Sequence, residues 1–400
     1  MRKQNPVKKT ETSANNSSLY NSPPRLHGIH LPHSPFSISI SNSHTMKRNL
    51  PCLLFSFLLL IGHVPEFSKN LLLRKLWLVF PLLLLFQILD MLVMCLISFK
   101  KGVTLKNDAT YISSLVCNLM IWHSLRRKNS HLIDLLRNLE KICPAIHNRI
   151  TDIIVLIILS FPFTFSITST LVCNRARASL FYAYGYELKS PVLQASAICI
   201  KKFLLFLFHS TFPSLVAVLF CNLCLRFSFC YDCLTQKILH YSPDEFGTPE
   251  QIEILRQKAE IDDMLEKLQD VFSIPSFFVI VSLLSSCLSF LGMHFTGKFL
   301  KCIEVSAVFY GVPNLVYLII LLWIAGSIPV EQNKLQGAFY KRTHSRFLLH
   351  LTSQEQQCKR EILDKNVFVL NGCSTFSYTR SSILALIGSL LTYSLLIYQN

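Results

Sequence analysis

Long uninterrupted runs of apolar residues constrain this chain more than any other feature of its sequence. A helix needs about 20 predominantly apolar residues to cross a bilayer, because every backbone N–H and C=O must be paired inside the segment. Six runs meet this requirement, and a seventh, at 109–125, is shorter. The seven runs cover 76–99, 109–125, 150–173, 203–225, 271–295, 303–326 and 380–398. The sequence therefore predicts an all-α, polytopic membrane protein with seven transmembrane helices.

The composition agrees with a lipid environment. Charged residues make up 16% of the chain, against roughly 25% in an ordinary soluble protein. The net charge of +16 would indicate a nucleic-acid partner in a soluble protein. Here the Lys and Arg residues lie mainly between the apolar runs, so the expected partner is the lipid bilayer with its anionic headgroups, and no nucleic acid.

The first 75 residues differ in composition from the rest of the chain. Residues 1–50 are rich in Ser, Asn, Pro and His, which predicts a disordered segment. Residues 51–75 contain the apolar run CLLFSFLLLI at 52–61, which is too short to span a bilayer. Three interpretations of this run are open: a membrane-skimming or juxtamembrane helix, the core of a signal peptide if translation began at Met46, or an additional span.

Two long polar segments separate the later apolar runs. The first contains one apolar helix face, made by Ile254, Ile261, Leu265, Leu268 and Phe272. This face predicts a helix that extends the fifth span out of the membrane, after a turn at 241–249. The second polar segment predicts a further helix at 353–366.

The distribution of basic residues favours a cytoplasmic N-terminus and an extracellular C-terminus. The short basic segment 126–149 and the residues just before Trp77 carry most of this signal. Sequons for N-glycosylation occur only at Asn15 and Asn16, and in this orientation they would stay unmodified.

The sequence has no phosphate-binding glycine loop, nucleophile elbow or ordinary metal-ligand cluster, so we expect neither an enzyme nor a cofactor. The most suggestive group is Cys221, Cys224, Cys230 and Cys233. Zinc binding, palmitoylation near the inner face and plain packing are the alternatives for these thiols, and packing is preferred because the first pair lies inside an apolar run.

Asp90 lies inside the first predicted span. An intramembrane carboxylate is costly, so it is a functional candidate by default. The alternative is a carboxylate that faces the bundle and bonds to a neighbour. Glu304 is expected at the membrane interface, and His209 and His294 are expected as ordinary polar residues within the bundle.

The last apolar run has two different sides. Small or polar residues share one stripe, namely Ser381, Ala385, Gly388, Ser389 and Thr392, whereas Leu384, Ile387, Leu391 and Ile397 lie opposite. A small-residue stripe allows close packing against another helix. The same stripe also suits the wall of a water-filled pore, and spacing alone leaves both interpretations open.

The end of this run carries a resemblance. The sequence from Thr392 and Tyr393 to Gln399 resembles the arthropod gustatory receptor motif, which has Thr-Tyr, five mostly hydrophobic residues and Gln-Phe. The chain departs from the motif at Ser394 and at Asn400, which stands in place of the Phe. Seven runs, long segments after the fourth and sixth, and a motif in the seventh also match that family's plan over roughly residues 70–400.

The resemblance implies a chemosensory receptor of the plasma membrane, similar to the insect odorant receptors. Members of that group act as ligand-gated cation channels and assemble as homo- or hetero-tetramers. It implies that a small-molecule tastant binds within the bundle and that the seventh helices line the pore. Gln399 would then form a polar ring near the outer mouth, and Leu395 and Leu396 an apolar constriction.

Two other functions remain as alternatives. A G-protein-coupled receptor also has seven spans, but its Asp-Arg-Tyr and Asn-Pro-x-x-Tyr motifs are missing from this sequence. A membrane transporter would use Asp90 as its coupling group.

Overall fold

The computed structural model describes residues 51–62, 71–100, 106–142, 148–172, 175–295, 305, 307–347, 353–363 and 367–399. The segment 1–50, which the sequence predicts to be disordered, lies outside the described residues.

Helices form nearly all of the described chain. The first are α2 (Cys52–Leu60), α3 (Leu71–Lys100), α4 (Lys106–Arg127), α5 (Asn129–Ile142), α6 (Asn148–Val172) and α7 (Arg175–Tyr182). Next come α8 (Pro191–Phe206), the π-helical segment η2 (Leu207–Thr211), α9 (Phe212–His240) and α10 (Thr248–Phe295). The last are the π-helical segment η3 (Ala307–Gly311), α12 (Val312–Ala325), α13 (Ser327–Phe347), α14 (Ser353–Leu363) and α15 (Ser381–Gln399). A small hairpin precedes α15, in which β1 (Asn371–Gly372) pairs antiparallel with β2 (Phe376–Ser377).

Five of the described helical stretches are long and apolar enough to cross a membrane, by length and composition. They are Val79–Ile97, Arg149–Val172, Pro191–His240, Thr248–Ser289 and Ala307–Arg346. They contain or overlap the predicted first, third, fourth, fifth and sixth spans. The predicted second and seventh spans are also helices, α4 and α15, and Ser381–Tyr393 of α15 is a shorter apolar helix.

Apolar side chains cover much of the outer surface of these helices. Leu82, Phe86, Leu89 and Leu96 form one such face on α3, and all four are more than half exposed. A soluble protein rarely exposes so continuous an apolar surface. Lipid hydrocarbon is the medium that such a surface suits.

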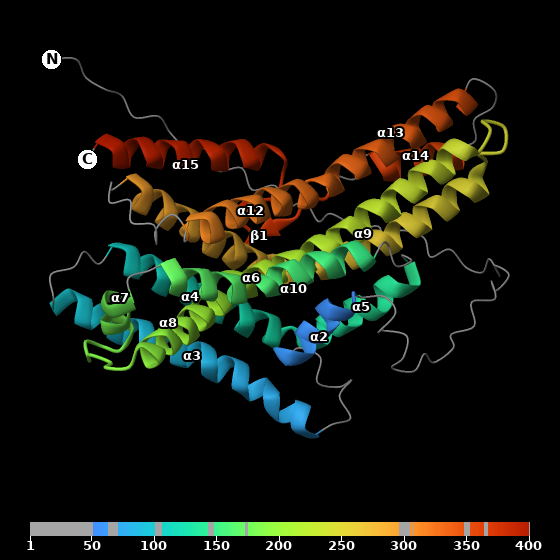
Figure 1. Cartoon of the computed structure of the whole chain (residues 1–400). Coiled ribbons are helices and arrows are strands. Elements are labelled where there is room, and N and C mark those ends of the chain that lie inside the picture. The colour runs from blue at the N-terminus through green and yellow to red at the C-terminus, as the bar shows by residue number, and fades with distance from the viewer. Residues whose placement is uncertain are drawn as a thin grey trace, which may run out of the picture. The chain divides into compact units, whose positions relative to one another are not determined.

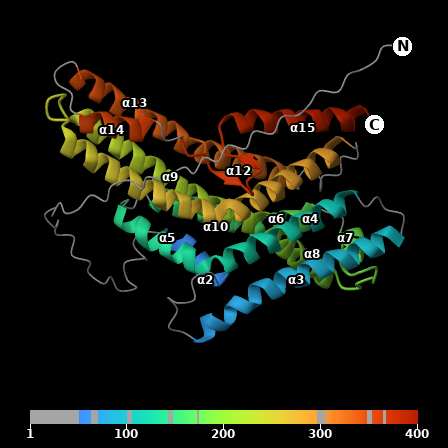
Figure 2. The same ribbon diagram turned by 180° about the vertical axis from the view of Figure 1, so that it is seen from behind.

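Helix α10 lies at the centre of the described bundle. It packs against α4, α9, α12, α5 and α15, and Figures 1 and 2 show it running alongside α9 and α4 from opposite views. The apolar face predicted for 254–272 is confirmed, since its five residues are at most 2% exposed. The predicted continuity is also confirmed, because one helix runs from Thr248 to Phe295 after the turn at 241–247.

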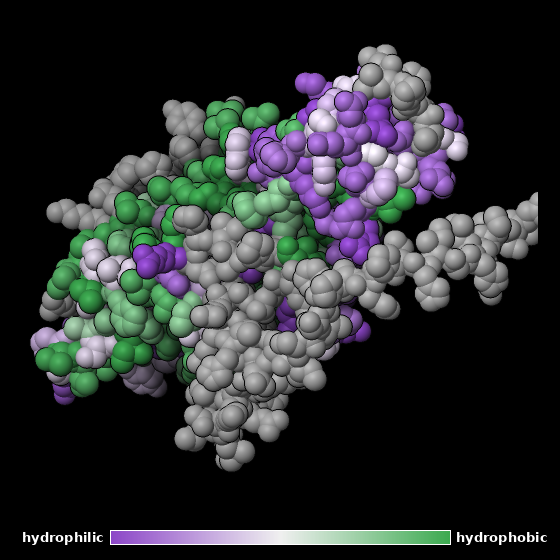
Figure 3. Space-filling model, turned by 90° about the vertical axis from the view of Figure 1, so that its right-hand side faces the viewer, coloured by the Kyte–Doolittle hydropathy of each residue, from purple (hydrophilic) through white to green (hydrophobic). Residues whose placement is uncertain are grey.

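One end of the bundle is polar. It is formed by α13, α14 and the ends of α9 and α10, and we call it the polar end. Figure 3 shows hydrophilic residues gathered in this region and hydrophobic residues over most of the rest of the coloured surface. The predicted helix at 353–366 is present here as α14, which packs against α10 and α13.

Four of the described helices lie where the sequence indicated only connecting segments, and one of them is α13, in the polar segment before α14. The segment 126–149 contains α5, an amphipathic helix that packs against α10. The segment 174–202 contains α7 and most of α8. Because α8, η2 and α9 follow one another without a break, the predicted fourth span belongs to a single helical stretch from Pro191 to His240.

The short apolar run at 52–61 folds as α2 and packs against α3 and α6. The backbone N–H of Leu53 donates to Asp152 Oδ1 at 3.1 Å. At the other end of α2, Trp122 Nε1 donates to the Ile61 carbonyl at 3.2 Å, and Arg126 donates to the Gly62 carbonyl. The helix is therefore bonded to α4 and α6 as part of the bundle.

Candidate functional site

Two π-helical segments each lead directly into an apolar helix, η2 into α9 and η3 into α12. Phe212-Pro213 follows η2 and Val312-Pro313 follows η3, so both helices restart with a proline in their first turn. A proline has no backbone N–H and leaves a carbonyl of the preceding turn unpaired, which favours a wider turn. Such π turns occur frequently at functional sites.

The backbone of η2 has a specific partner on α4. In a π turn, the carbonyl of Phe208 would accept from the N–H of residue 213, but that residue is a proline. Asn118 Nδ2 instead donates to the Phe208 carbonyl at 2.6 Å. The side chain of Asn118 is fully buried, so this bond fixes the π turn against α4.

An aromatic cluster fills the space between the two π segments. We define it as Tyr111, Phe165, Phe206, His209 and Tyr310. The centroid of the Tyr310 ring lies 4.6 Å from Phe206, 5.1 Å from Phe165 and 5.3 Å from His209. The His209 ring lies 4.8 Å from that of Tyr111. Four stretches of the chain, from α4, α6, α8–η2 and η3, thus meet at one buried position.

Two members of the aromatic cluster carry polar atoms without a hydrogen-bond partner in the described part of the chain. They are Nδ1 of His209 and the hydroxyl of Tyr310, on residues that are 2% and 5% exposed. Most buried polar atoms in proteins are paired with protein or ordered water. The cluster therefore brings aromatic rings together with polar atoms that a small ligand or a water molecule would satisfy.

Further polar groups surround the aromatic cluster. Ser286 Oγ lies 3.5 Å from His209 Nε2, and Ser210 Oγ donates to Asn314 Oδ1 at 2.9 Å. Asn314 Nδ2 and Ser289 Oγ are buried and without a hydrogen-bond partner among the described residues. Polar groups on α10, η2 and α12 therefore lie next to the aromatic surface.

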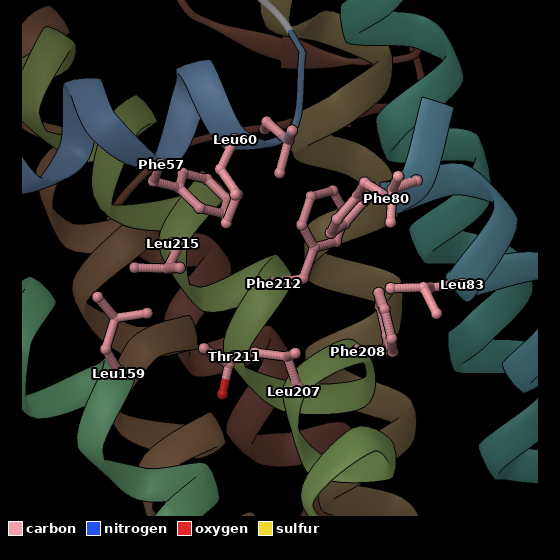
Figure 4. Close-up of a pocket in the computed structure, with 12 residues that line it drawn as sticks. Phe57, Leu60, Phe80, Leu83, Leu159, Leu207, Phe208, Thr211, Phe212 and Leu215 are labelled. Carbon is pink, nitrogen blue, oxygen red and sulfur yellow. The ribbon is translucent and has the colours of Figure 1, made fainter. Parts of the chain in front are cut away.

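An apolar cavity of about 170 Å³ lies on another side of η2, and we call it the lateral cavity. Its walls come from α2, α3, α6, η2 and α9. Figure 4 shows that aromatic and aliphatic side chains surround it, including Phe57, Phe80, Phe208 and Phe212. Among the described residues that line it, Thr211 is the only polar one. A second cavity, of about 280 Å³, lies between α6, α9 and α12.

The predicted pore residues lie on α15, which packs against α10 and α12. The buried side of this helix consists of Ile383, Leu386 and Leu390. Thr392, Tyr393, Leu395 and Leu396 are exposed. Gln399 is the last residue of the helix, and its side chain lies outside the described residues.

The small-residue stripe of α15 is also exposed over its whole length. A Cβ added at Gly388 would meet no atom within 4 Å. The hydroxyls of Ser389 and Thr392 donate to carbonyls one turn earlier in the same helix, at 2.9 Å in both cases. Within a single chain, therefore, the stripe does not pack against another described helix.

The hairpin before α15 is hydrogen-bonded to α10. Gln269 on α10 accepts from the N–H of Asn371 at 2.9 Å and donates to its carbonyl at 2.6 Å. The hydroxyls of Ser276 and Tyr378 are 2.7 Å apart. Burial raises the pKa of the Tyr378 hydroxyl, so it stays protonated in this contact. The last helix is thus tied to the central helix just before it begins.

Asp90, the intramembrane carboxylate, is paired in the structure. It is 5% exposed and forms an ion pair with Lys201 on α8. The hydroxyl of Tyr184 also bonds to Asp90, and Lys201 Nζ lies 2.8 Å from that hydroxyl. This geometry corresponds to the expected alternative of a carboxylate bonded to a neighbour. His209 belongs to the aromatic cluster, whereas Glu304 and the side chain of His294 lie outside the described residues.

The four cysteines singled out in the sequence do not form one group. Cys221 and Cys224 are buried thiols and Cys233 is an exposed thiol, whereas Cys230 takes part in a disulfide. In the described part of the chain, no group of three or more His, Cys, Asp or Glu side chains is placed to hold a metal ion.

The comparisons with known proteins agree with this architecture at the level of the fold. No protein-family model matches the chain, and no curated protein matches it in sequence. The solved structure of the insect olfactory receptor OR5 from Machilis hrabei matches with a TM-score of 0.60 and 16% identity, over 83% of this chain and 90% of the receptor. The structure of OR5 in complex with eugenol matches over the same shares, with a TM-score of 0.60 and 12% identity. The chain therefore has the fold of the insect olfactory receptors, as its resemblance to the related gustatory receptors predicted.

Proposed function

We propose that this protein is a chemosensory receptor that works as a ligand-gated cation channel and detects a small-molecule tastant. The observation that carries the proposal is the aromatic cluster, four of whose five residues are buried. Two of its polar atoms have no hydrogen-bond partner among the described residues, and it is built at two π turns in the fold of an insect olfactory receptor. A ligand with an aromatic ring and one hydroxyl would stack on His209 or Tyr310 and satisfy their polar atoms. OR5 itself has been solved with eugenol, a molecule of this chemical class.

The rest of the channel follows from the same proposal. Seven helices, α3, α4, α6, α8–α9, α10, α12 and α15, cross the plasma membrane, with the N-terminus cytoplasmic and the C-terminus extracellular. Four copies, identical or related, surround a pore lined by α15. Its exposed small-residue stripe supports this arrangement, because the stripe has no packing partner among the described residues of its own chain.

Helix α10 connects the aromatic cluster with the hairpin that precedes α15. Ser282 and Ser286 face Asn118 and His209, while Gln269 and Ser276 of the same helix hold the hairpin before α15. A ligand that binds one position of α10 better than another shifts the population of that position. A movement of α10 is then passed directly to the start of the pore helix.

The test is to express the protein in cells without native partners and record currents while G-protein signalling is blocked. Small aromatic alcohols, including eugenol, are suitable first ligands. We expect cation currents that persist under the block. Responses that disappear under it would favour the G-protein-coupled alternative. A transporter is not favoured by the structure, since Asp90 is held by Lys201 and Tyr184.

A further inference from the structure

The lateral cavity differs from the aromatic cluster in both chemistry and access. Four of the five residues of the cluster are buried and two of them carry polar atoms, whereas the described residues that line the lateral cavity are apolar apart from Thr211. Thr211 gives this wall little polar character, since Figure 4 shows its hydroxyl directed away from the rings of Phe57, Phe80 and Phe212. The Thr211 hydroxyl is buried and has no hydrogen-bond partner among the described residues, and the other lining side chains offer a polar or charged ligand no partner. Hydrocarbon is therefore the guest that this lining suits.

The mouth of the lateral cavity lies on the surface that suits lipid. Leu60 on α2 and Val79 and Leu83 on α3 line it and are 55%, 43% and 41% exposed. On α3 they adjoin the exposed apolar face that includes Leu82 and Phe86. In a membrane this surface is in contact with acyl chains. The cavity is therefore continuous with the hydrocarbon of the bilayer.

The depth of the cavity suits part of a chain. Phe208, Phe212 and Leu215 line its inner side and are only 1–2% exposed. An apolar cavity of about 150 Å³ stays dry and takes a guest of the size of benzene. The 170 Å³ found here accommodates a short stretch of hydrocarbon of comparable volume.

We propose that the lateral cavity binds the acyl chain of a membrane phospholipid, which enters from the bilayer at Leu60, Val79 and Leu83. Acyl chains surround the mouth at a concentration that no dilute ligand reaches, so mass action favours them. Inside the cavity, the acyl chain packs against Phe208 and Phe212. These residues flank His209 and Ser210 in sequence, so the lipid supports the π turn from the side opposite to the polar groups of the candidate ligand site. This inference goes beyond the proposed function and does not depend on it.

The test uses the full chain in vesicles of phosphatidylcholine that carries a photoactivatable diazirine near the end of one acyl chain. After illumination, the labelled residues are identified by peptide mass spectrometry. We expect adducts on Phe208, Phe212 and Leu215, which lipid reaches only by entering the cavity. Adducts restricted to exposed residues such as Leu82 and Phe86 would overturn the proposal.

Two matched variants sharpen the result. Leu83→Trp fills the mouth, and we expect it to abolish the adducts on Phe212 and Leu215 while labelling of Phe86 continues. Leu82→Trp lies on the same helix, is 62% exposed and is outside the lining, so it should leave the pattern unchanged. Val79→Trp is a second filling variant if Leu83→Trp does not fold. Displacement of the internal adducts by eugenol would assign the cavity to a small-molecule ligand and contradict the proposal.

Discussion

Two buried tyrosines in this protein have opposite hydrogen-bond environments. The hydroxyl of Tyr310 has no partner among the described residues, whereas that of Tyr231 donates to Asp262 at 2.7 Å and accepts from Gln332 at 2.8 Å. Leaving a buried polar group unpaired costs about 1–3 kcal/mol. Replacing Tyr231 and Tyr310 by Phe should therefore change the free energy of unfolding differently, because only the Tyr231 hydroxyl has protein partners among the described residues.

We expect Tyr310→Phe to leave the free energy of unfolding unchanged or to raise it by about 1–2 kcal/mol, because it removes an unsatisfied group. The same variant should weaken the response to a hydroxylated aromatic ligand about 5- to 10-fold, the equivalent of one hydrogen bond. Thermal unfolding of the purified protein and a dose–response curve measure the two effects. The control, Tyr231→Phe, should lower stability by about 1–3 kcal/mol. Equal losses of stability in both variants would remove Tyr310 from the ligand site.

Asp90 can also be tested by changing single residues, because it is bonded to the side chains of Lys201 and Tyr184. Asp90→Asn leaves Lys201, which is 20% exposed at its side chain, without its counter-ion. We expect a loss of about 1–3 kcal/mol, at or below the usual cost of breaking a buried pair because Lys201 is partly exposed. The double variant Asp90→Asn with Lys201→Met should recover most of that loss, and both forms should still conduct once they reach the membrane. Failure of the double variant to recover would show that Asp90 does more than pair with Lys201.

At the scale of elements, the sequence best predicts those helices that a long apolar run or a regular apolar spacing marks. Runs of apolar residues located α3, α6 and α15, and the spacing from Ile254 to Phe272 located the extension of α10. Helix α5 was missed because it is too short to span, although Leu132, Leu135, Leu136 and Leu139 already formed an apolar face that α10 buries.

The candidate site was harder to predict for a different reason. His209 and Tyr310 are far apart in sequence, and only the packing of α8–η2 against η3 brings their rings together. One local signal was available, since Pro213 and Pro313 each interrupt an apolar helix near these residues. The hairpin before α15 had no comparable signal, because its strands are only two residues long.

The hairpin carries a prediction of its own. We expect Gln269→Ala, which removes both bonds to Asn371, to change the ligand concentration for half-activation several-fold, since α15 is then less firmly tied to α10. Single-channel conductance should stay the same, because Gln269 does not lie on α15. Lys267→Ala, at an exposed position of the same helix, is the control and should change neither quantity. A changed conductance in Gln269→Ala would mean that the hairpin shapes the pore itself.

At the scale of the whole molecule, the small-residue stripe of α15 has no packing partner among the described residues of its own chain. Among the described side chains of α15, Ile383, Leu386 and Leu390 are buried within the subunit. The small-residue stripe and the aliphatic residues Leu384, Ile387 and Leu391 are exposed. Lipid suits the aliphatic side. The stripe, whose hydroxyls bond to their own backbone, suits either a neighbouring copy of α15 or water, and in a tetrameric channel it would meet both.

Gly388→Leu tests this assignment, because the subunit itself has room for the new side chain. We expect the thermal stability of the solubilised single subunit to be unchanged, whereas the assembled channel should lose conductance or fail to assemble, since Leu at this position fills the space around the central axis. Ile387→Ala is the matched control: it lies on the aliphatic side, is 37% exposed, and should alter neither assembly nor conductance. Size measurements in detergent and single-channel recording separate the two effects. Normal assembly and conductance in Gly388→Leu would place the stripe against lipid and move the pore away from α15. A loss in Ile387→Ala alone would place the aliphatic side at the axis instead.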